Sequence, residues 1–133
     1  MMFWSKRRHD APLPYVKCRP TTNPILPVSD VAEASDFYRS LGFEVVAYDE
    51  GYAWVKHCGW EWFHLARVDD LELGGGNAAA SLHVEDAGEW HAAITEASAG
   101  SVDIPAPENT PWGKHEFAFL DPYGNRIRIG SPS

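Results

Sequence analysis

Polar and apolar residues alternate in several short runs of the chain, whereas two longer runs carry apolar residues at helical spacing. The helical runs cover residues 31–41 and 87–97. Each follows a short alternating run and an aspartate, Asp30 or Asp86, with a glutamate three residues later, which is the arrangement of a capping box. The first run ends at Gly42, a residue that tolerates the left-handed conformation common after a helix. The pattern therefore predicts two units in which a strand leads into a helix.

The two units belong to an internal repeat with a period of 56 residues. The repeated positions are Leu26, Val28, Asp30 and Glu33 in the first unit and Leu82, Val84, Asp86 and Glu89 in the second. Three strand-like runs follow each predicted helix, at 43–48, 52–57 and 60–68 in the first half and at 102–104, 114–120 and 126–129 in the second. Each half therefore reads as a βαβββ module, and the chain is predicted to have an α+β fold in which two tandem modules form a cupped mixed sheet.

The length of 133 residues suits a single domain with a core of its own. We expect residues 23–133 to form this domain, with module one at 23–68, a glycine-containing linker at 69–77 and module two at 78–130. Residues 1–22 combine prolines with basic side chains, and they are expected to form an N-terminal arm outside the domain.

Alternation along the predicted strands separates two faces. The first face is apolar and suited to packing under the helices, with Leu26, Val28, Ala53, Val55, Phe63, Leu65, Leu82, Val84, Ile127 and Ile129. The second mixes large aromatic and polar side chains: Tyr52, Trp54, Trp62, His64, Ser81, His83, Arg126 and Arg128. Flat apolar area with a few polar groups is typical of a small-molecule site. The alternative is that these aromatic side chains pack in a dimer interface.

Charge narrows the classes of partner. The net charge is −8, and the first twenty residues hold five Lys and Arg against one Asp, so the remaining residues carry −12. A negative domain disfavours nucleic acid, because phosphate binding needs a positive field. The chain also has no apolar run long enough for a membrane span, and its N-terminus lacks the apolar run of a signal peptide. We therefore expect a cytoplasmic protein with a small-molecule partner, without nucleic-acid or membrane partners.

Two groups of residues resemble a known family. The first is PVSDV at 27–31, with FY at 37–38 and LGF at 41–43, and the second is PWG at 111–113, EFA at 116–118 and DPYGN at 121–125. Together with the paired modules, residues 23–130 resemble the vicinal oxygen chelate superfamily, which includes glyoxalases, bleomycin-resistance proteins and dioxygenases. Trp112 between Pro and Gly is most similar to the bleomycin-resistance branch.

The resemblance allows the metal positions of the superfamily to be inspected one by one. They fall on Asn23, Ala79, Arg128 and, near the end of the third strand of module one, His64. Alanine has no donor atom and arginine is a permanent cation, so only His64 is a good ligand. We therefore expect no metal, no cofactor and no catalytic residue. A metal-dependent glyoxalase-like or dioxygenase-like enzyme using His64, His83, His115 or Glu116 is the alternative.

The resemblance then implies a non-catalytic protein that binds and sequesters bleomycin-family glycopeptide antibiotics and so gives resistance. In that branch the stacking aromatic side chains correspond to Tyr52 and Trp112, the latter followed by Gly113. Ser81 and His83 correspond to residues facing the drug groove, and Asp49 and Glu50 are candidate carboxylates for the cationic part of the drug. The candidates taken from alternation alone are Trp54, Trp62 and His64.

The branch also implies an assembly. Its groove lies between two protomers that exchange their first strand, and Pro24 occupies the place of the proline associated with that exchange. A strand-exchanged homodimer is therefore expected. Two features leave the ligand open. Arg126 and Arg128 suit an anionic ligand unless acids such as Glu61 or Glu116 pair with them, and a carrier or sensor of another small aromatic metabolite would share the same fold.

Overall fold

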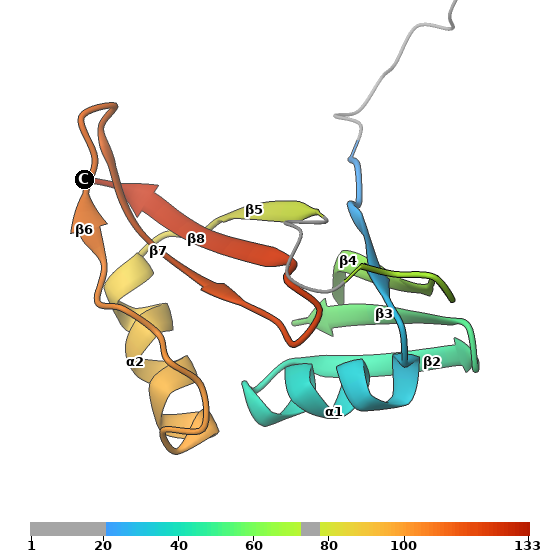
Figure 1. Cartoon of the computed structure of the whole chain (residues 1–133). Helices are drawn as coiled ribbons and strands as arrows, with labels where there is room; N and C mark the ends of the chain where they lie inside the picture. Colours follow the sequence, from blue (N-terminus) through green and yellow to red (C-terminus); the bar gives the residue numbers. More distant parts are fainter. Residues whose placement is uncertain (1–20, 73–77) are drawn as a thin grey trace, which may run out of the picture.

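The computed structural model describes residues 21–72 and 78–133 and has an α+β fold in two similar halves (Figure 1). The elements of the first half are β1 (Ile25–Val28), α1 (Val31–Ser40), β2 (Glu44–Asp49), β3 (Tyr52–His57) and β4 (Trp60–Arg67). Those of the second half are β5 (Ala79–His83), α2 (Ala87–Ser98), β6 (Glu108–Asn109), β7 (Lys114–Leu120) and β8 (Arg126–Pro132). The predicted α+β fold with two βαβββ modules is confirmed, with two sheets in place of one, and the strand-exchanged homodimer stays a prediction. Residues 1–20 of the predicted arm and 73–77 of the predicted linker lie outside the described residues.

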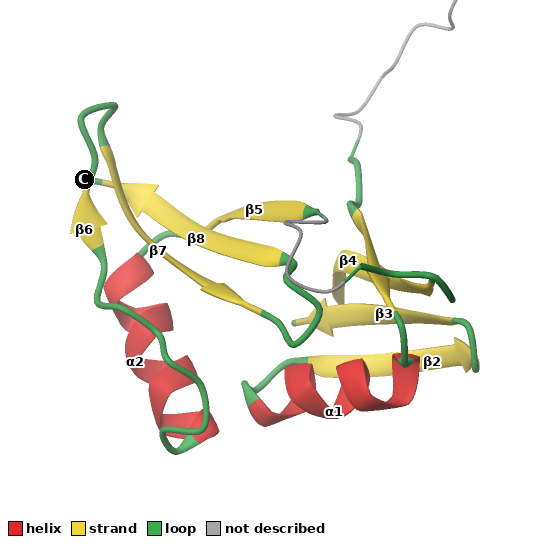
Figure 2. Ribbon diagram, in the orientation of Figure 1, coloured by secondary structure: helices red, strands yellow, loops and turns green. Residues whose placement is uncertain are grey.

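Each half forms its own four-stranded mixed sheet. The strand orders are β1-β4-β3-β2 and β5-β8-β7-β6. In each sheet the first strand is parallel to its neighbour and the other pairs are antiparallel. The helix of each half packs on its own sheet, and Figure 2 shows both helices below the sheets. One face of each sheet is therefore left without a helix over it.

The buried faces of the two sheets are the predicted ones. Leu26, Val55, Phe63 and Ile127 have no exposed surface at all. Of the ten residues assigned to this face, only Val84 is half-buried instead of buried. The face opposite to them, which carries Tyr52, is the one left without a helix.

Both helices begin where the capping boxes predict. The Asp30 and Asp86 side chains accept hydrogen bonds from the backbone N–H groups of Glu33 and Glu89, at 3.0 and 3.1 Å. These bonds satisfy N–H groups that have no partner within the helix. The first helix ends before Gly42, whose φ of +104° is the left-handed conformation expected there. In the described part of the chain, neither helix is long and apolar enough to span a membrane.

The strand predicted at 102–104 is wrong. This segment has no strand structure, and the short strand of module two is β6, further along in the proline-rich stretch. Val102 and Ile104 are instead half-buried against the hydrophobic core, and the carbonyl of Ile104 accepts a hydrogen bond from Nε2 of His91 on α2 at 3.1 Å. The apolar alternation in this segment thus comes from packing beside a helix.

The turn between β7 and β8 joins the two halves. The buried Asp121 carboxylate accepts hydrogen bonds from the backbone N–H groups of Tyr123 and Asn125, both at 2.9 Å, and from the hydroxyl of Tyr38 on α1 at 2.8 Å. The Asn125 side chain donates to the Pro27 carbonyl at 2.8 Å, and the Tyr123 hydroxyl donates to Glu33. The DPYGN motif therefore has a structural role in this chain, because it holds the second half against α1.

The same contacts perturb two tyrosines. Burial and the adjacent Asp121 carboxylate raise the pKa of Tyr38 well above its ordinary value. Burial and the hydrogen bond to Glu33 raise the pKa of Tyr123 in the same direction. Both hydroxyls therefore keep their protons, and their hydrogen bonds, at pH values where an ordinary tyrosine would ionise.

Candidate functional site

Four aromatic side chains gather on the uncovered face of the first sheet. Tyr52 and Trp54 from β3, Tyr48 from β2 and His64 from β4 meet edge to face, with ring centroids 5.4–6.4 Å apart. Such T-shaped pairs are favourable aromatic geometries, so the cluster is a preformed surface. We call these four residues the ring cluster. Tyr52, Trp54 and His64 are half-buried and Tyr48 is exposed, which leaves ring surface available to a ligand.

A chain of hydrogen bonds runs through the ring cluster. The Tyr52 hydroxyl lies 2.6 Å from Nδ1 of His64, and Nε2 of His64 lies 2.8 Å from a carboxylate oxygen of Glu61. The Tyr52 hydroxyl, which a phenylalanine ring at this position would lack, thus has a hydrogen-bond partner. The carboxylate next to the predicted aromatic face is Glu61, which also adds a negative charge to that face.

A β-bulge in β4 explains the position of Glu61. Val55 pairs with Phe63, but Lys56 pairs with Glu61, so the register skips one residue. Glu61 therefore reaches the face of His64, although three residues of a regular strand would separate them onto opposite faces.

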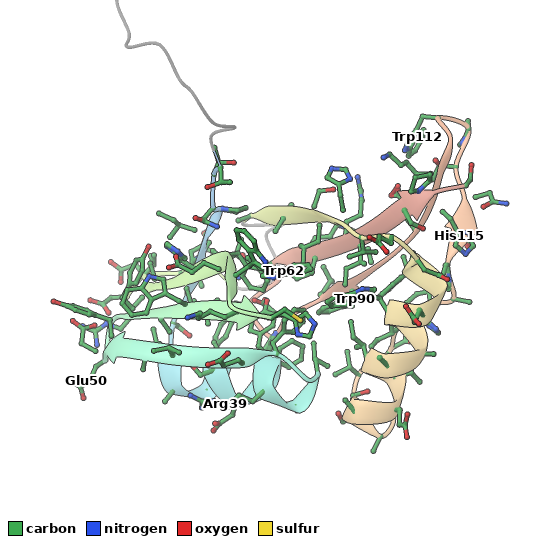
Figure 3. All side chains as sticks on the ribbon, turned by 180° about the vertical axis from the view of Figure 1, so that it is seen from behind. Arg39, Glu50, Trp62, Trp90, Trp112 and His115 are labelled. Atoms are coloured by element: carbon green, nitrogen blue, oxygen red, sulfur yellow. The ribbon has the colours of Figure 1, made fainter. Side chains whose placement is uncertain are left out.

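Trp62 does not join the ring cluster, contrary to simple alternation. Its ring packs against Phe43, His57 and Trp90, and its indole N–H donates to the His57 carbonyl at 3.2 Å. Figure 3 shows Trp62 beside Trp90, where the two halves meet. The side chain is thus part of the packing between the halves.

A groove between the two sheets brings several predicted residues together. It has a volume of about 620 Å³ and is lined on one side by residues 21–24, just before β1, and by the start of β4, and on the other side by β5. Pro24, Trp62, Ser81 and His83 all contribute to its wall. Ser81 and His83 are exposed, as their place on the outer face of β5 predicts.

The predicted carboxylates Asp49 and Glu50 lie elsewhere. Both line a cavity of about 660 Å³ beside α1, together with Asp36, Arg39 and Arg67. Asp49 also accepts a hydrogen bond from the backbone N–H of Gly51 at 2.8 Å, which stabilises the turn. Asp49 is thus the cross-strand neighbour of Tyr52, but it shares its cavity with two arginines.

Trp112 and Gly113 lie on the second half, in the turn before β7. Trp112 is 67% exposed, and Gly113 has a φ of +84°, which a turn of this shape requires. Figure 3 places Trp112 and Glu50 at opposite ends of the molecule. Within one chain, the residues predicted for the ligand site therefore do not converge on one point.

The uncovered face of the second sheet has its own charges. The Nε of Arg128 lies 3.2 Å from the Glu116 carboxylate, and Glu116 is also the cross-strand neighbour of Glu108. These residues and Trp112 line one cavity of about 440 Å³, together with Arg126. Arg126 has no ion-pair partner among residues 21–72 and 78–133. Within the described ranges, Arg128 is thus the one of these two arginines that pairs with an acid.

Tyr48 and Glu108 were not predicted at these sites, and Glu61, expected as a partner of Arg126 or Arg128, pairs with His64 instead. Tyr48 follows the alternation of β2, so its spacing could have placed it on the aromatic face. Glu61 could not be found in this way, because the bulge alone brings it to His64. Glu108 is in the two-residue strand β6, for which the sequence has no alternating pattern.

The residues at the superfamily's metal positions do not fit a metal. Arg128 is held by Glu116, Ala79 has no side-chain donor, and His64 has both ring nitrogens in hydrogen bonds to Tyr52 and Glu61. The Asn23 amide donates to the Glu61 carbonyl at 3.0 Å. In the part of the chain that the structure describes, no three His, Cys, Asp or Glu side chains are grouped so that they could hold a metal ion.

Comparison with known proteins agrees with this architecture. Residues 21–129 match the model of the Glyoxalase/Bleomycin resistance protein/Dioxygenase superfamily. A bleomycin resistance protein of Klebsiella pneumoniae is 30% identical over 113 residues, covering 80% of this chain and 87% of that protein.

Two solved structures are also similar. The bleomycin-binding protein in complex with bleomycin has a TM-score of 0.74 at 24% identity, covering 86% of this chain and 100% of that one. TnmS3, an antibiotic binding protein from Streptomyces sp. CB03234, has a TM-score of 0.65 at 30% identity, covering 90% of this chain and 100% of that one. The chain therefore belongs to the Glyoxalase/Bleomycin resistance protein/Dioxygenase superfamily.

Proposed function

We propose that this protein binds bleomycin-family glycopeptide antibiotics without changing them, and that sequestration of the drug gives resistance. The ring cluster carries the proposal, because it offers flat aromatic surface next to the Glu61 carboxylate. A ligand with a flat heteroaromatic part and a cationic tail matches both features. The net charge of −8 favours the approach of such a cation.

The comparisons support the same choice. The relative from Klebsiella pneumoniae is a bleomycin resistance protein, and TnmS3 binds an antibiotic. The metal positions of the superfamily, which its enzymes would need, hold residues that do not suit a metal. A metal-dependent enzyme would need metal ligands at these positions, whereas binding without catalysis does not.

We further propose that the site is completed in a cytoplasmic homodimer. Trp112 and Glu50 lie at opposite ends of one chain, so the residues expected at the ligand site do not come together within it. In a dimer, the ring cluster of one protomer and Trp112 of its partner would line one groove. Here β1 pairs with β4 of the same chain, and its exchange through Pro24 is part of this proposal.

The experiment is a calorimetric titration of wild type and two matched tryptophan variants with bleomycin. Trp54→Ala removes a ring of the cluster, and it should weaken binding at least tenfold, from a lost stacking contact of about 0.5–1.5 kcal/mol plus lost burial. Trp90→Phe changes a tryptophan between the halves and should bind as wild type does. Equal affinity of Trp54→Ala and wild type would refute the assigned site.

A further inference from the structure

The hydrogen-bond chain in the ring cluster has a fixed direction. A carboxylate can only accept, so the contact between Glu61 and His64 requires the proton on Nε2 of His64. In the neutral imidazole, Nδ1 then carries a lone pair and accepts. While His64 is neutral, the Tyr52 hydroxyl, 2.6 Å away, therefore donates its proton to Nδ1.

Hydrogen bonds to main-chain carbonyl groups hold the residues of this hydrogen-bond chain in place. The backbone N–H of His64 donates to the Pro24 carbonyl at 2.8 Å, which fixes β4 against β1. The Glu61 carbonyl accepts from the Asn23 side chain at 3.0 Å, and the bulge turns the Glu61 side chain toward His64. His64 is also enclosed, since only 16% of its side chain is exposed. The direction of the hydrogen bonds from Tyr52 through His64 to Glu61 is thus set before any ligand binds.

The consequence for a ligand concerns the Tyr52 oxygen. Its single proton points to His64, so toward the uncovered face the hydroxyl offers lone pairs only. Glu61, with 47% of its side chain exposed, adds negative charge at the other end of the chain. Trp54 on the same strand provides the ring surface beside this acceptor.

We propose that the Tyr52 hydroxyl is a specificity determinant, which accepts a hydrogen bond from a protonated amine or amide N–H of a flat aromatic ligand and disfavours ligands that offer an acceptor there. The inference rests on the proposed antibiotic-binding function and names the chemistry that the site selects. His64 and Glu61 are positioning residues for this hydroxyl. They act through Tyr52 and need no contact with the ligand.

The test uses two synthetic bithiazoles that differ only at the end of one short side chain, a primary ammonium or a carboxylate. Their affinities are measured by calorimetry with wild type, Tyr52→Phe and, as a control outside the ring cluster, Ser40→Ala on α1. Neither substitution changes a charge or removes a ring, so the general attraction of an acidic protein for cations is the same in all three. The ratio of the two affinities therefore reports the hydroxyl alone.

Wild type should prefer the ammonium probe, and Tyr52→Phe should reduce that preference roughly three- to tenfold, the effect of one hydrogen bond. Ser40→Ala, which removes an exposed hydroxyl outside the ring cluster, should leave the preference unchanged. An unchanged ratio in Tyr52→Phe, with wild type binding bleomycin, overturns the inference and leaves the proposed function standing. Failure of wild type to bind bleomycin and both probes overturns the two together.

A second measurement, made without a ligand, tests which ring nitrogen of His64 carries the proton and hence the direction of these hydrogen bonds. Nitrogen-15 NMR of the histidine side chains should show Nε2 of His64 protonated and Nδ1 unprotonated in the neutral form, with assignment by the His64→Gln variant. Glu61→Gln should weaken this preference between the two nitrogens. A proton on Nδ1 in wild type would overturn the inference, because Tyr52 would then be free to donate outward.

Discussion

Tyr38→Phe removes one oxygen atom from the contact that joins the two halves, and its cost follows from the structure. Tyr38 has no exposed surface, Asp121 is 5% exposed, and the hydroxyl donates to the carboxylate at 2.8 Å. A buried hydrogen bond to a charged group contributes about 1.5–3 kcal/mol. Asp121 keeps three other donors, from Tyr123 and Asn125, so no unpaired charge remains. We therefore expect a loss of about 1.5–2 kcal/mol in the free energy of unfolding.

The assay is urea unfolding at a fixed protein concentration, since a dimer would make stability depend on concentration. Tyr48→Phe is the matched control, because this tyrosine is 71% exposed and should lose less than about 0.5 kcal/mol. If both variants unfold at the same urea concentration, the turn between β7 and β8 does not hold the halves together and the structural role given to DPYGN is refuted.

Three further predictions concern stability. Stability should fall above about pH 10, because unfolded tyrosines lose their protons there while native Tyr38 and Tyr123, with raised pKa values, keep theirs. Urea midpoints measured from pH 8 to 11 should show this decline, and it should be shallower in the variant that combines Tyr38→Phe with Tyr123→Phe. Asn125→Ala removes two hydrogen bonds of a fully buried amide and should cost about 2–4 kcal/mol by urea unfolding, whereas Asn109→Ala on exposed β6 should cost little. Trp62→Ala should lower the thermal midpoint through lost packing on Trp90 and leave bleomycin affinity close to that of wild type. A loss of affinity with an unchanged thermal midpoint would place Trp62 in the ligand site.

Much of the fold follows from local patterns in the sequence. Capping residues Asp30 and Asp86 begin both helices, and alternation identifies the buried faces of both sheets. These features depend on neighbours within a few positions, which is why spacing alone predicts them. The strand expected at 102–104 fails for the same reason, because half-buried residues packed beside α2 produce the alternation of a strand without any partner strand.

The candidate site was less predictable, because it depends on contacts that periodicity does not contain. One skipped residue in the register of β4 moves Glu61 to His64 and turns Trp62 toward Trp90. The pairing of Arg128 with Glu116 likewise depends on which strands are neighbours. Alternation therefore finds Tyr52, Trp54 and His64 on one face but cannot assign their hydrogen bonds.

The most direct test of the account is the titration of purified wild type with metal-free bleomycin, repeated at high salt. We expect saturable binding with one drug per chain, weakened by salt because an acidic protein binds a cation. We also expect a dimer by sedimentation in the same buffer. Absence of binding heat and of a thermal shift, at drug concentrations well above the protein's, would contradict the claim that this face binds bleomycin.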